Sequence, residues 1–267
     1  MSDISVIILV GQERLHIRRS LEKLLALAPR QIFVVESQPS DGTHEIAVEM
    51  GVQTVFNKWP GLQSSQFNWA LDNLPIDSTW ILRLDADEYL TPESMEWLKA
   101  KLDGVDEKVA ALEFTLERKF MGGVIRHGTN GIKMVRMFRR GRGRYSATLM
   151  DERIVFDGEK LVVPVVFYDD NLNSLEWWKE KHCGYAKREA QQAIESMKSG
   201  VWTDPRKAKY YQLPPYIRAF MYFCVRYFLK LGFLDGMAGL RWHFWQGLWY
   251  RCLVDREIGK LKRSARE

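Results

Sequence analysis

The first hundred residues alternate between short apolar runs and segments whose apolar side chains recur at helical spacing. The strand-like runs are residues 4–10, 31–36, 52–56 and 79–84. The helix-like segments between them are residues 15–27, 43–50 and 63–74. Buried strands that alternate with amphipathic helices are typical of a parallel sheet with crossover helices, so an α/β fold is expected.

The pattern changes after Pro92. A helix is predicted at residues 93–102, and the strand-like runs that follow have no long helices between them: residues 109–120, 133–138, 152–156 and 161–168. Such strands are typical of antiparallel additions that border the ligand crevice at the carboxyl ends of a parallel sheet. Helices are predicted from residue 174 onward, at residues 175–197, 215–231 and 236–254, before a basic tail at residues 260–266.

Composition narrows the class of protein without fixing it. The 267 residues are 46% hydrophobic and 27% charged, which is enough for a sizeable core. Three scattered cysteines predict neither a disulfide framework nor a zinc pair. The chain begins directly with a strand-like run, and charges interrupt every apolar stretch, so a cytoplasmic protein without a spanning helix is expected. A net charge of +5 is compatible with nucleic acid, anionic lipid or phosphorylated small molecules.

Two aspartates, Asp85 and Asp87, follow the apolar run at residues 79–84. Strand ends of this kind lie at the edge where α/β folds bind ligands. Carboxylate oxygens suit Mg²⁺ or Mn²⁺, and such an ion commonly keeps one or two protein carboxylates while substrate phosphates complete its shell. Asp87 is the better metal-ligand candidate. The alternative is that the acidic segment only begins a loop and caps the helix after Pro92.

Glu36 ends the second strand-like run, where an acidic side chain can accept hydrogen bonds from a ribose or a base edge. Ser40 and Asp41, which follow it, are better explained as capping residues for the helix predicted to begin near Thr43.

These features together resemble the family 2 inverting glycosyltransferases of the GT-A fold, and among them the lipopolysaccharide core and capsule-type enzymes. The resemblance rests on Gln12-Glu13, Glu36, Ser40-Asp41-Gly42-Thr43, Gln66 with Asn68, Asp85-Ala86-Asp87-Glu88, the run from Val135 to Arg140, and Asp151-Glu152-Arg153. It implies a GT-A catalytic domain at residues 1–170, with a nucleotide-binding half at 1–92 and an acceptor-side half at 93–170. Residues 171–267 would form a C-terminal helical, aromatic and basic region.

The resemblance also implies roles for individual residues. Val10, Gln12, Glu36 and Gln66 would line the nucleotide pocket, Asp85 would approach the ribose or diphosphate, and Asp87 would hold Mg²⁺ or Mn²⁺. Gln12 and Glu36 stand where the family has Asn and Asp, and Asp151 stands where it has His. These differences concern the bound base and sugar more than the fold.

Inverting transfer needs a base on the acceptor hydroxyl. Glu152 is the first candidate because it matches the family's acidic position, and Asp169 and Asp170 are the second. Glu152 could equally be a surface charge paired with an arginine. We therefore expect a metal-dependent hexosyltransferase that uses a nucleotide-diphosphate sugar, UDP-linked by preference. Its acceptor would be a saccharide or lipid-linked precursor in lipopolysaccharide or other cell-surface polysaccharide synthesis.

Two basic regions leave alternatives open. Arg139, Arg140, Arg142 and Arg144 could contact a phosphorylated group or form a solvated loop. Aromatic and basic side chains mix between residues 213 and 254, which suits peripheral contact with the anionic inner face of the plasma membrane. The alternative is that these aromatic side chains pack the helices together.

Other enzyme classes fit the sequence less well. The segment after the first strand-like run, Gly11-Gln12-Glu13-Arg14, is not the glycine-rich basic loop of a nucleotidyltransferase, and GxGxxG and GxxxxGK[ST] are absent. No nucleic-acid-binding module is recognisable, so nucleic acid is not an expected partner. A catalytically inactive sugar-nucleotide-binding or scaffold protein at the membrane remains the alternative function.

Overall fold

The computed structural model describes residues 2–38, 41–129, 131–146, 153–202 and 204–264. The chain forms two compact units. The first comprises residues up to 118 together with 131–172, and the second comprises residues 119–130 together with 173–267.

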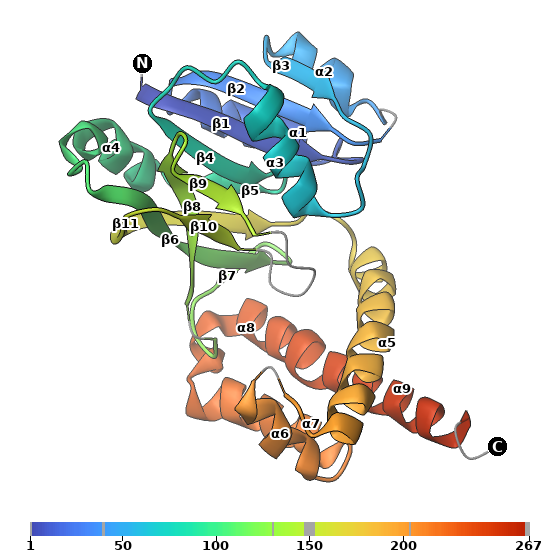
Figure 1. Ribbon diagram of the computed structural model, residues 1–267. Coiled ribbons are helices and arrows are strands. Elements are labelled where there is room, and N and C mark those ends of the chain that lie inside the picture. The colour runs from blue at the N-terminus through green and yellow to red at the C-terminus, as the bar shows by residue number, and fades with distance from the viewer. Residues whose placement is uncertain (1, 39–40, 130, 147–152, 203, 265–267) are drawn as a thin grey trace. The chain divides into compact units, whose positions relative to one another are not determined.

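The first unit is built on a mixed sheet (Figure 1). Its strands are β1 (Ser2–Val10), β2 (Pro29–Glu36), β3 (Gln53–Phe56), β4 (Trp80–Asp85), β5 (Glu88–Leu90), β6 (Val109–Phe120), β8 (Ile132–Arg139) and β11 (Glu159–Asp170), in the order β3-β2-β1-β4-β8-β6-β11-β5. The pairs β1–β2, β1–β4 and β2–β3 are parallel, whereas β4–β8, β6–β8 and β5–β11 are antiparallel. The predicted α/β sheet with antiparallel additions is therefore confirmed.

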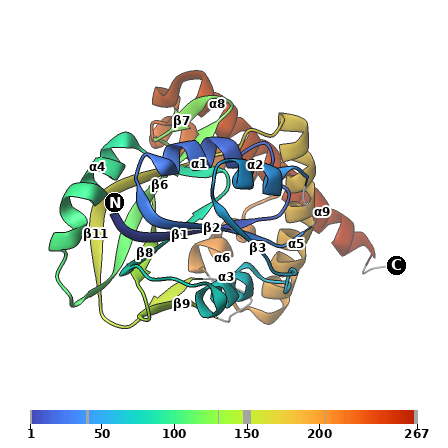
Figure 2. The same ribbon diagram turned by 90° about the horizontal axis from the view of Figure 1, so that it is seen from above.

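Each face of this sheet has its own cover. Helices α1 (Ile17–Leu25), α2 (Thr43–Glu49) and α4 (Pro92–Lys101) lie on one face. Helix α3 (Gln63–Asn73) and the antiparallel pair β9 (Gly143–Tyr145) and β10 (Ile154–Phe156) cover the other. Figure 2 shows α1 and α2 on one side of β1 and β2, with α3 and β9 on the opposite side.

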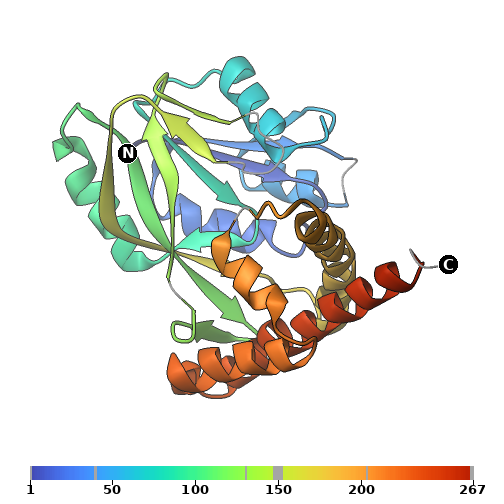
Figure 3. The ribbon, with the colours of Figure 1, turned by 60° about the horizontal axis from the view of Figure 1, so that its bottom comes forward.

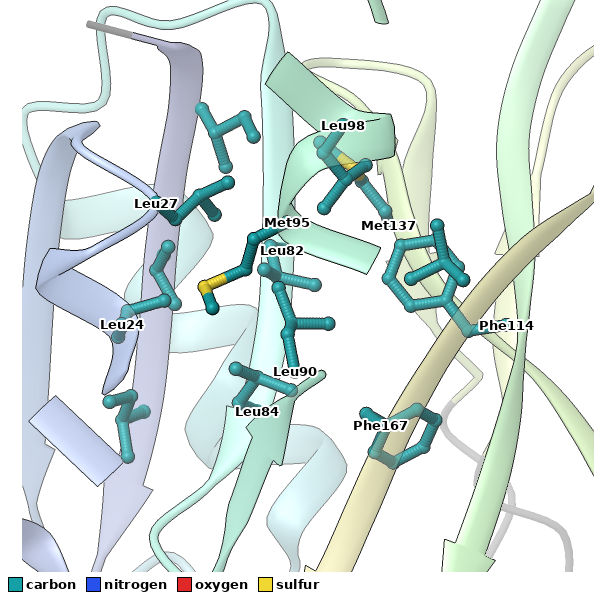
Figure 4. Packing of buried hydrophobic residues seen from close by; sticks show 14 of the residues in the cluster. Leu24, Leu27, Leu82, Leu84, Leu90, Met95, Leu98, Phe114, Met137 and Phe167 are labelled. Atoms are coloured by element: carbon teal, nitrogen blue, oxygen red, sulfur yellow. The ribbon is translucent and has the colours of Figure 1, made fainter. Parts of the chain in front are cut away.

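The larger core cluster lies under α1 and α4. Leu24 and Leu27 lie on one side of it, Leu82 and Leu84 of β4 at its centre, and Phe114 on its far side (Figure 4). All five side chains are buried. Since β4 contributes buried residues on both of its faces, the strand that carries the candidate site is held from both sides.

Helices dominate the second unit (Figure 3). They are α5 (Leu175–Ser199), α6 (Pro205–Gln212), α7 (Ile217–Cys224), α8 (Gly236–Trp242) and α9 (Tyr250–Ser264), with π-helical turns at Val225–Leu229 and His243–Trp249. Ser174 caps α5 by accepting a hydrogen bond from the Trp177 N–H, and Gly200 ends it at a φ of 72°. Helices α5 and α9 pack through the buried Ala186 and Ala190 against Leu253 and Val254.

The π-helical turns explain where the predicted helix boundaries differ from the observed ones. The segment expected as one helix at residues 215–231 is α7 followed by a π-helical turn, and the segment at 236–254 is α8 and a π-helical turn that continue into α9. Strands β5 and β9, at three residues each, were not predicted because they are too short to show a periodicity. Within the described residues, no helix is both long and apolar enough to span a membrane.

Candidate functional site

The candidate site begins where three parallel strands end at one edge of the sheet. The pairing register sets Leu9 beside Asp85 and Val10 beside Glu36. The carboxyl ends of β1, β2 and β4 therefore bring Glu36 and Asp85 to the same edge, on opposite sides of β1. This is the edge at which open α/β sheets bind their ligands.

The residues expected around the nucleoside differ in exposure. Glu36 is buried and accepts a hydrogen bond from Nδ1 of His44 at 2.8 Å. Val10 is buried, and its carbonyl accepts hydrogen bonds from the backbone N–H and the hydroxyl of Ser37, while Gln12 is exposed.

Gln66 is fully buried, and its side-chain amide forms hydrogen bonds with Asn57 at 2.7 and 3.0 Å. Gln66 would therefore shape the pocket through the loop after β3 rather than by direct contact.

Asp85 lies between two guanidinium groups. Its Oδ1 atom is 3.1 Å from the buried Arg83, and its Oδ2 atom is 3.9 Å from the buried Arg136. Burial opposes ionisation of Asp85, but the charges of Arg83 and Arg136 outweigh it and lower the pKa of this carboxyl. Asp85 is therefore held as a carboxylate.

Asp87 is placed in the loop between β4 and β5. Its Oδ2 atom accepts a hydrogen bond from the Asn171 side chain at 3.0 Å, and its backbone carbonyl accepts one from the N–H of Asp170. Burial raises the pKa of Asp87, and so does the negative charge of the nearby Asp169.

The alternative interpretation was that the acidic segment caps helix α4. That helix is capped by Thr91, whose side chain accepts a hydrogen bond from the Ser94 N–H at 3.2 Å. The acidic segment therefore does not serve as that helix's cap.

Glu88 is a component of the site that the sequence analysis did not single out. Its buried Oε1 atom accepts a hydrogen bond from Arg136 at 2.5 Å, and its Oε2 atom accepts one from the backbone N–H of Asp85 at 3.0 Å. Burial raises the pKa of Glu88, and the charge of Arg136 acts against that shift. Glu88 therefore ties the loop of Asp85 and Asp87 to strand β8. The partner of Glu88, Arg136, could have been noticed in the sequence, because it is a charged residue within the apolar pattern of β8.

The candidate bases differ in what surrounds them. Glu152 lies outside the described residues. Asp169 pairs with Arg118 at 2.8 Å, and Asp170 accepts hydrogen bonds from Arg19 at 2.9 Å and from the Tyr89 hydroxyl at 2.7 Å. Asp169 and Asp170 are thus each engaged by a neighbouring cation.

His16 joins two parts of the site that are distant in sequence. Its Nε2 atom accepts a hydrogen bond from the backbone N–H of Leu172 at 3.0 Å, so the ring proton lies on Nδ1. Nδ1 then donates to the Glu13 carboxylate at 2.7 Å. The loop after β1 is thereby fixed to the end of β11, a contact across 156 residues that no local pattern could reveal.

A cavity of about 820 Å³ opens beside Asp85. It is lined by Gln63 of α3, Arg83 and Asp85 of β4, and side chains of β8, β9 and β10. This volume is within the range that small organic ligands occupy, on the order of 300–1,000 Å³.

The arginines at the end of β8 and after it contact neighbouring loops and strands rather than the cavity. Arg139 lies over the Trp80 ring and donates to the Val109 carbonyl, and Arg142 donates to the carbonyls of Glu107 and Asp157. Arg140 donates to the Ile76 carbonyl and Arg144 pairs with Asp72. None of these four arginines lines the cavity, and Arg140 and Arg144 are exposed to solvent, as the alternative of a solvated loop expected.

The second unit divides its aromatic and basic residues between its interior and its surface. Arg218 is buried against Asp255, and Arg251 pairs with Glu189 at 2.6 Å. Trp242 is also buried. The large apolar side chains that are more than half exposed in this unit are Val201, Tyr216, Ile217, Phe220, Phe228, Leu229, Leu234 and Met237. Some of the aromatic side chains between residues 213 and 254 thus pack the helices together, as the alternative interpretation expected, and others face solvent.

A family profile matches the part of the chain that carries Glu36, Asp85 and Asp87. The profile of the family described as "Glycosyl transferase family 2" matches residues 5–149, more than half of the chain. No curated protein shows a significant sequence match.

Similar solved structures include glucosyl-3-phosphoglycerate synthase from Mycobacterium tuberculosis with Mn²⁺, UDP and phosphoglyceric acid, at 18% identity and a TM-score of 0.37, over 43% of either chain. The same enzyme with Mg²⁺ and UDP matches at 17% identity and a TM-score of 0.37, over 43% of this chain and 44% of the other. The chain thus spans less than half of these solved proteins. The extent of the profile match shows that the chain belongs to glycosyl transferase family 2.

Proposed function

We propose that this chain is an inverting glycosyltransferase that moves a sugar from a nucleotide-diphosphate sugar, UDP-linked by preference, to a saccharide or lipid-linked acceptor. The observation that carries the proposal is the convergence of Glu36, Asp85 and Asp87 at the carboxyl edge of β2 and β4. Residues 5–149, which contain all three, are those that match the family.

The nucleoside would lie beside β1 and β2. Glu36 would accept hydrogen bonds from the ribose or the base, with His44 holding its carboxylate in place at 2.8 Å. Val10 and the exposed Gln12 would form the neighbouring wall. Asp85, kept ionised by Arg83 and Arg136, would approach the ribose or the diphosphate.

Asp87 would hold a Mg²⁺ or Mn²⁺ ion, and its surroundings fit that role. Asp169 and Asp85 lie close enough to raise its pKa, so a cation would relieve their mutual repulsion. Within the described residues no three acidic, histidine or cysteine side chains are grouped as a metal site. Phosphate oxygens and water would therefore supply most of the shell, as is usual for Mg²⁺. When bound, the cation would neutralise charge on the departing diphosphate.

The chain's own residues would carry out the remaining tasks. A carboxylate base would accept the proton of the acceptor hydroxyl as that oxygen attacks the anomeric carbon and the bond to the diphosphate breaks. Glu152 remains the first candidate, because it matches the family's acidic position. Asp169 and Asp170 remain the alternatives, although both already neutralise arginines.

The acceptor would belong to lipopolysaccharide or other cell-surface polysaccharide synthesis, at the cytoplasmic face of the membrane. The exposed apolar side chains of the second unit support peripheral contact with an anionic bilayer. Leu229 is 77% exposed and Met237 is 61% exposed, with the exposed cations Lys230 and Arg241 on the same unit. Aromatic and aliphatic side chains with cations nearby suit the interfacial zone of a bilayer.

The test is calorimetric binding of UDP, GDP, dTDP and CMP, each with and without Mn²⁺, to the chain and to Asp87→Ala. We expect the chain to bind one nucleotide diphosphate more tightly with Mn²⁺, and Asp87→Ala to lose that enhancement while retaining the fold. An Asp87→Ala protein with unchanged Mn²⁺-dependent affinity would remove the metal assignment. Turnover of the matching nucleotide sugar would separate an enzyme from an inactive sugar-nucleotide-binding or scaffold protein.

A further inference from the structure

The cavity beside Asp85 lies on the acceptor side of the sheet. Its walls come from β8, β9, β10 and the beginning of β11, together with Gln63 of α3. In the sheet order, β8 neighbours β4 on the side away from β1 and β2, where the nucleoside would lie. The cavity is therefore a different part of the crevice from the proposed nucleoside pocket, and the two meet at Asp85.

Two buried arginines form the inner wall of this cavity. Arg83 is 5% exposed and Arg136 is 6% exposed. The Nε atoms of both are buried and have no hydrogen-bond partner among the residues that the structure describes. Asp85 and Glu88 fix the other ends of the two guanidinium groups. Burial of a cation is costly unless it is paired and hydrogen-bonded, and Arg83 meets this through Asp85, Gln63 and the Tyr145 hydroxyl. The two arginines thus give the inner wall of the cavity a fixed positive charge.

The rest of the lining adds positive charge and apolar surface. Lys133, Arg153 and Lys160 join the two arginines, and Lys160 pairs with Glu113 at 2.6 Å. Among the residues that the structure describes, the lining thus holds five cationic side chains and two carboxylates, Asp85 and Glu113. Tyr145 and Phe156 provide aromatic surface in the same cavity. Aromatic faces suit a sugar ring, whereas the excess of cations suits a negatively charged substituent.

We propose that this cavity binds the acceptor, and that the acceptor is a saccharide bearing a phosphate or carboxylate group. The inference rests on the proposed function, since it assumes that the sugar donor occupies the β1 and β2 side. Arg83 and Arg136 form the inner wall, and Lys133 and Arg153 attract and hold the anionic group at the outer part of the cavity. Arginine is suited to this role because its planar donors match the geometry of phosphate and carboxylate oxygens.

The test uses inorganic phosphate as the probe. Phosphate is titrated by calorimetry into the full chain, alone and after saturation with UDP and Mn²⁺. Lys133→Ala and Arg153→Ala are compared with Lys101→Ala, which removes the same charge from an exposed position of α4 that does not line the cavity. These exposed positions are chosen because replacing a buried arginine could unfold the unit.

We expect phosphate to bind with and without UDP, and each cavity variant to weaken that binding by roughly threefold to tenfold. Lys101→Ala should leave it unchanged, and UDP affinity should be the same in all three variants. With neutral saccharides and their phosphorylated or carboxylated counterparts as acceptors, transfer should favour the charged member of each pair.

Three results would overturn the inference. Phosphate binding that is absent, or equally strong in Lys133→Ala and Arg153→Ala, would show that the cavity holds no anion site. Displacement of phosphate by UDP would show that the cavity holds the sugar donor's diphosphate. Equal or faster transfer to neutral saccharides would remove the charged acceptor. Failure of all four nucleotides, UDP, GDP, dTDP and CMP, to bind would instead refute the proposed function, and the titration without nucleotide would still decide the anion site.

Discussion

The Oε2 atom of Glu88 accepts a hydrogen bond from the backbone N–H of Asp85 at 3.0 Å. This contact closes the loop that carries Asp87, and the second oxygen of Glu88 receives Arg136. One buried carboxylate therefore sets both the shape of the candidate metal loop and the position of a cavity arginine.

Replacement of Glu88 by Gln should destabilise the first unit. The amide keeps nearly the same shape but leaves the buried Arg136 with only the more distant Asp85, at 3.9 Å, as an anionic partner, and loss of a buried partner typically costs up to about 3–5 kcal/mol. The free energy of unfolding in urea measures the effect. Glu96→Gln is the control, because Glu96 pairs with Lys99 while 74% exposed and should cost no more than about 1 kcal/mol. Equal losses in the two variants would contradict the role given to Glu88.

Amide variants of the three candidate bases should separate catalysis from folding. Glu152→Gln should retain nucleotide affinity and lose transfer by roughly 10²- to 10⁴-fold, the usual contribution of a general base. Asp170→Asn should chiefly lower thermal stability, because Asp170 neutralises Arg19 and accepts from Tyr89. Transfer rate, nucleotide affinity and melting temperature are measured for these variants and for Asp169→Asn. Near-normal transfer by Glu152→Gln would reassign the base to whichever aspartate variant loses turnover.

The second unit should lose stability in mild acid because of His243. Burial, and then the charge of Arg226, lower the pKa of this imidazole from about 6.5 to about 4. Between these values the unfolded chain binds a proton that the folded unit excludes. The contribution of His243 to the free energy of unfolding is therefore fully present above pH 6.5. It declines by up to about 3 kcal/mol as the pH falls toward 4.

Urea unfolding of the chain and of His243→Leu at pH 7.5, 5.5 and 4.5 measures this effect. The variant lacks the titrating group, so the difference in unfolding free energy between the two proteins should change with pH. Carboxylates that protonate in the same range affect both proteins and cancel. If the difference in unfolding free energy between the two proteins were the same at all three pH values, protonation of His243 would not be the cause of the lost stability.

The exposed apolar surface of the second unit should bind anionic vesicles. Leu229→Ser combined with Met237→Ser should lower the partition coefficient by more than about tenfold, since each side chain can contribute on the order of 1.5–3 kcal/mol when buried. Co-sedimentation with vesicles of phosphatidylglycerol and of phosphatidylcholine measures it. Val48→Ser, at a 52% exposed position of the first unit, is the control. Equal binding of the chain to both lipids, or equal binding of the double variant and the Val48→Ser control to anionic vesicles, would argue against this surface as the membrane contact.

The elements of the nucleotide-binding half could be predicted because each carries its own periodicity. Residues 4–10, for example, form all of β1 except its first two residues, and residues 63–73 form α3. Asp85 and Asp87 could be recognised because an apolar strand precedes them. Those inferences needed only local sequence.

The contacts that complete the site could not be predicted from such patterns. His16 meets Leu172, and Asp170 meets Arg19, across more than 150 residues in each case, and only the folded sheet brings them together. The same limit applies to Arg218, which could be taken for a surface cation from its aromatic neighbours. It is buried because Asp255, two helices later, supplies its counter-charge.

The antiparallel pairing of β5 with β11 bears on how the first unit can be divided. Glu88 of β5 pairs with Asp169, and β4 is completed on one side by β8. A fragment that ended at Pro92 would therefore leave strand edges open on both β4 and β5. We expect such a fragment to be insoluble alone and to regain structure when the remainder of the unit is supplied as a separate polypeptide. Residues 1–92 would then carry part of the site without being able to fold independently.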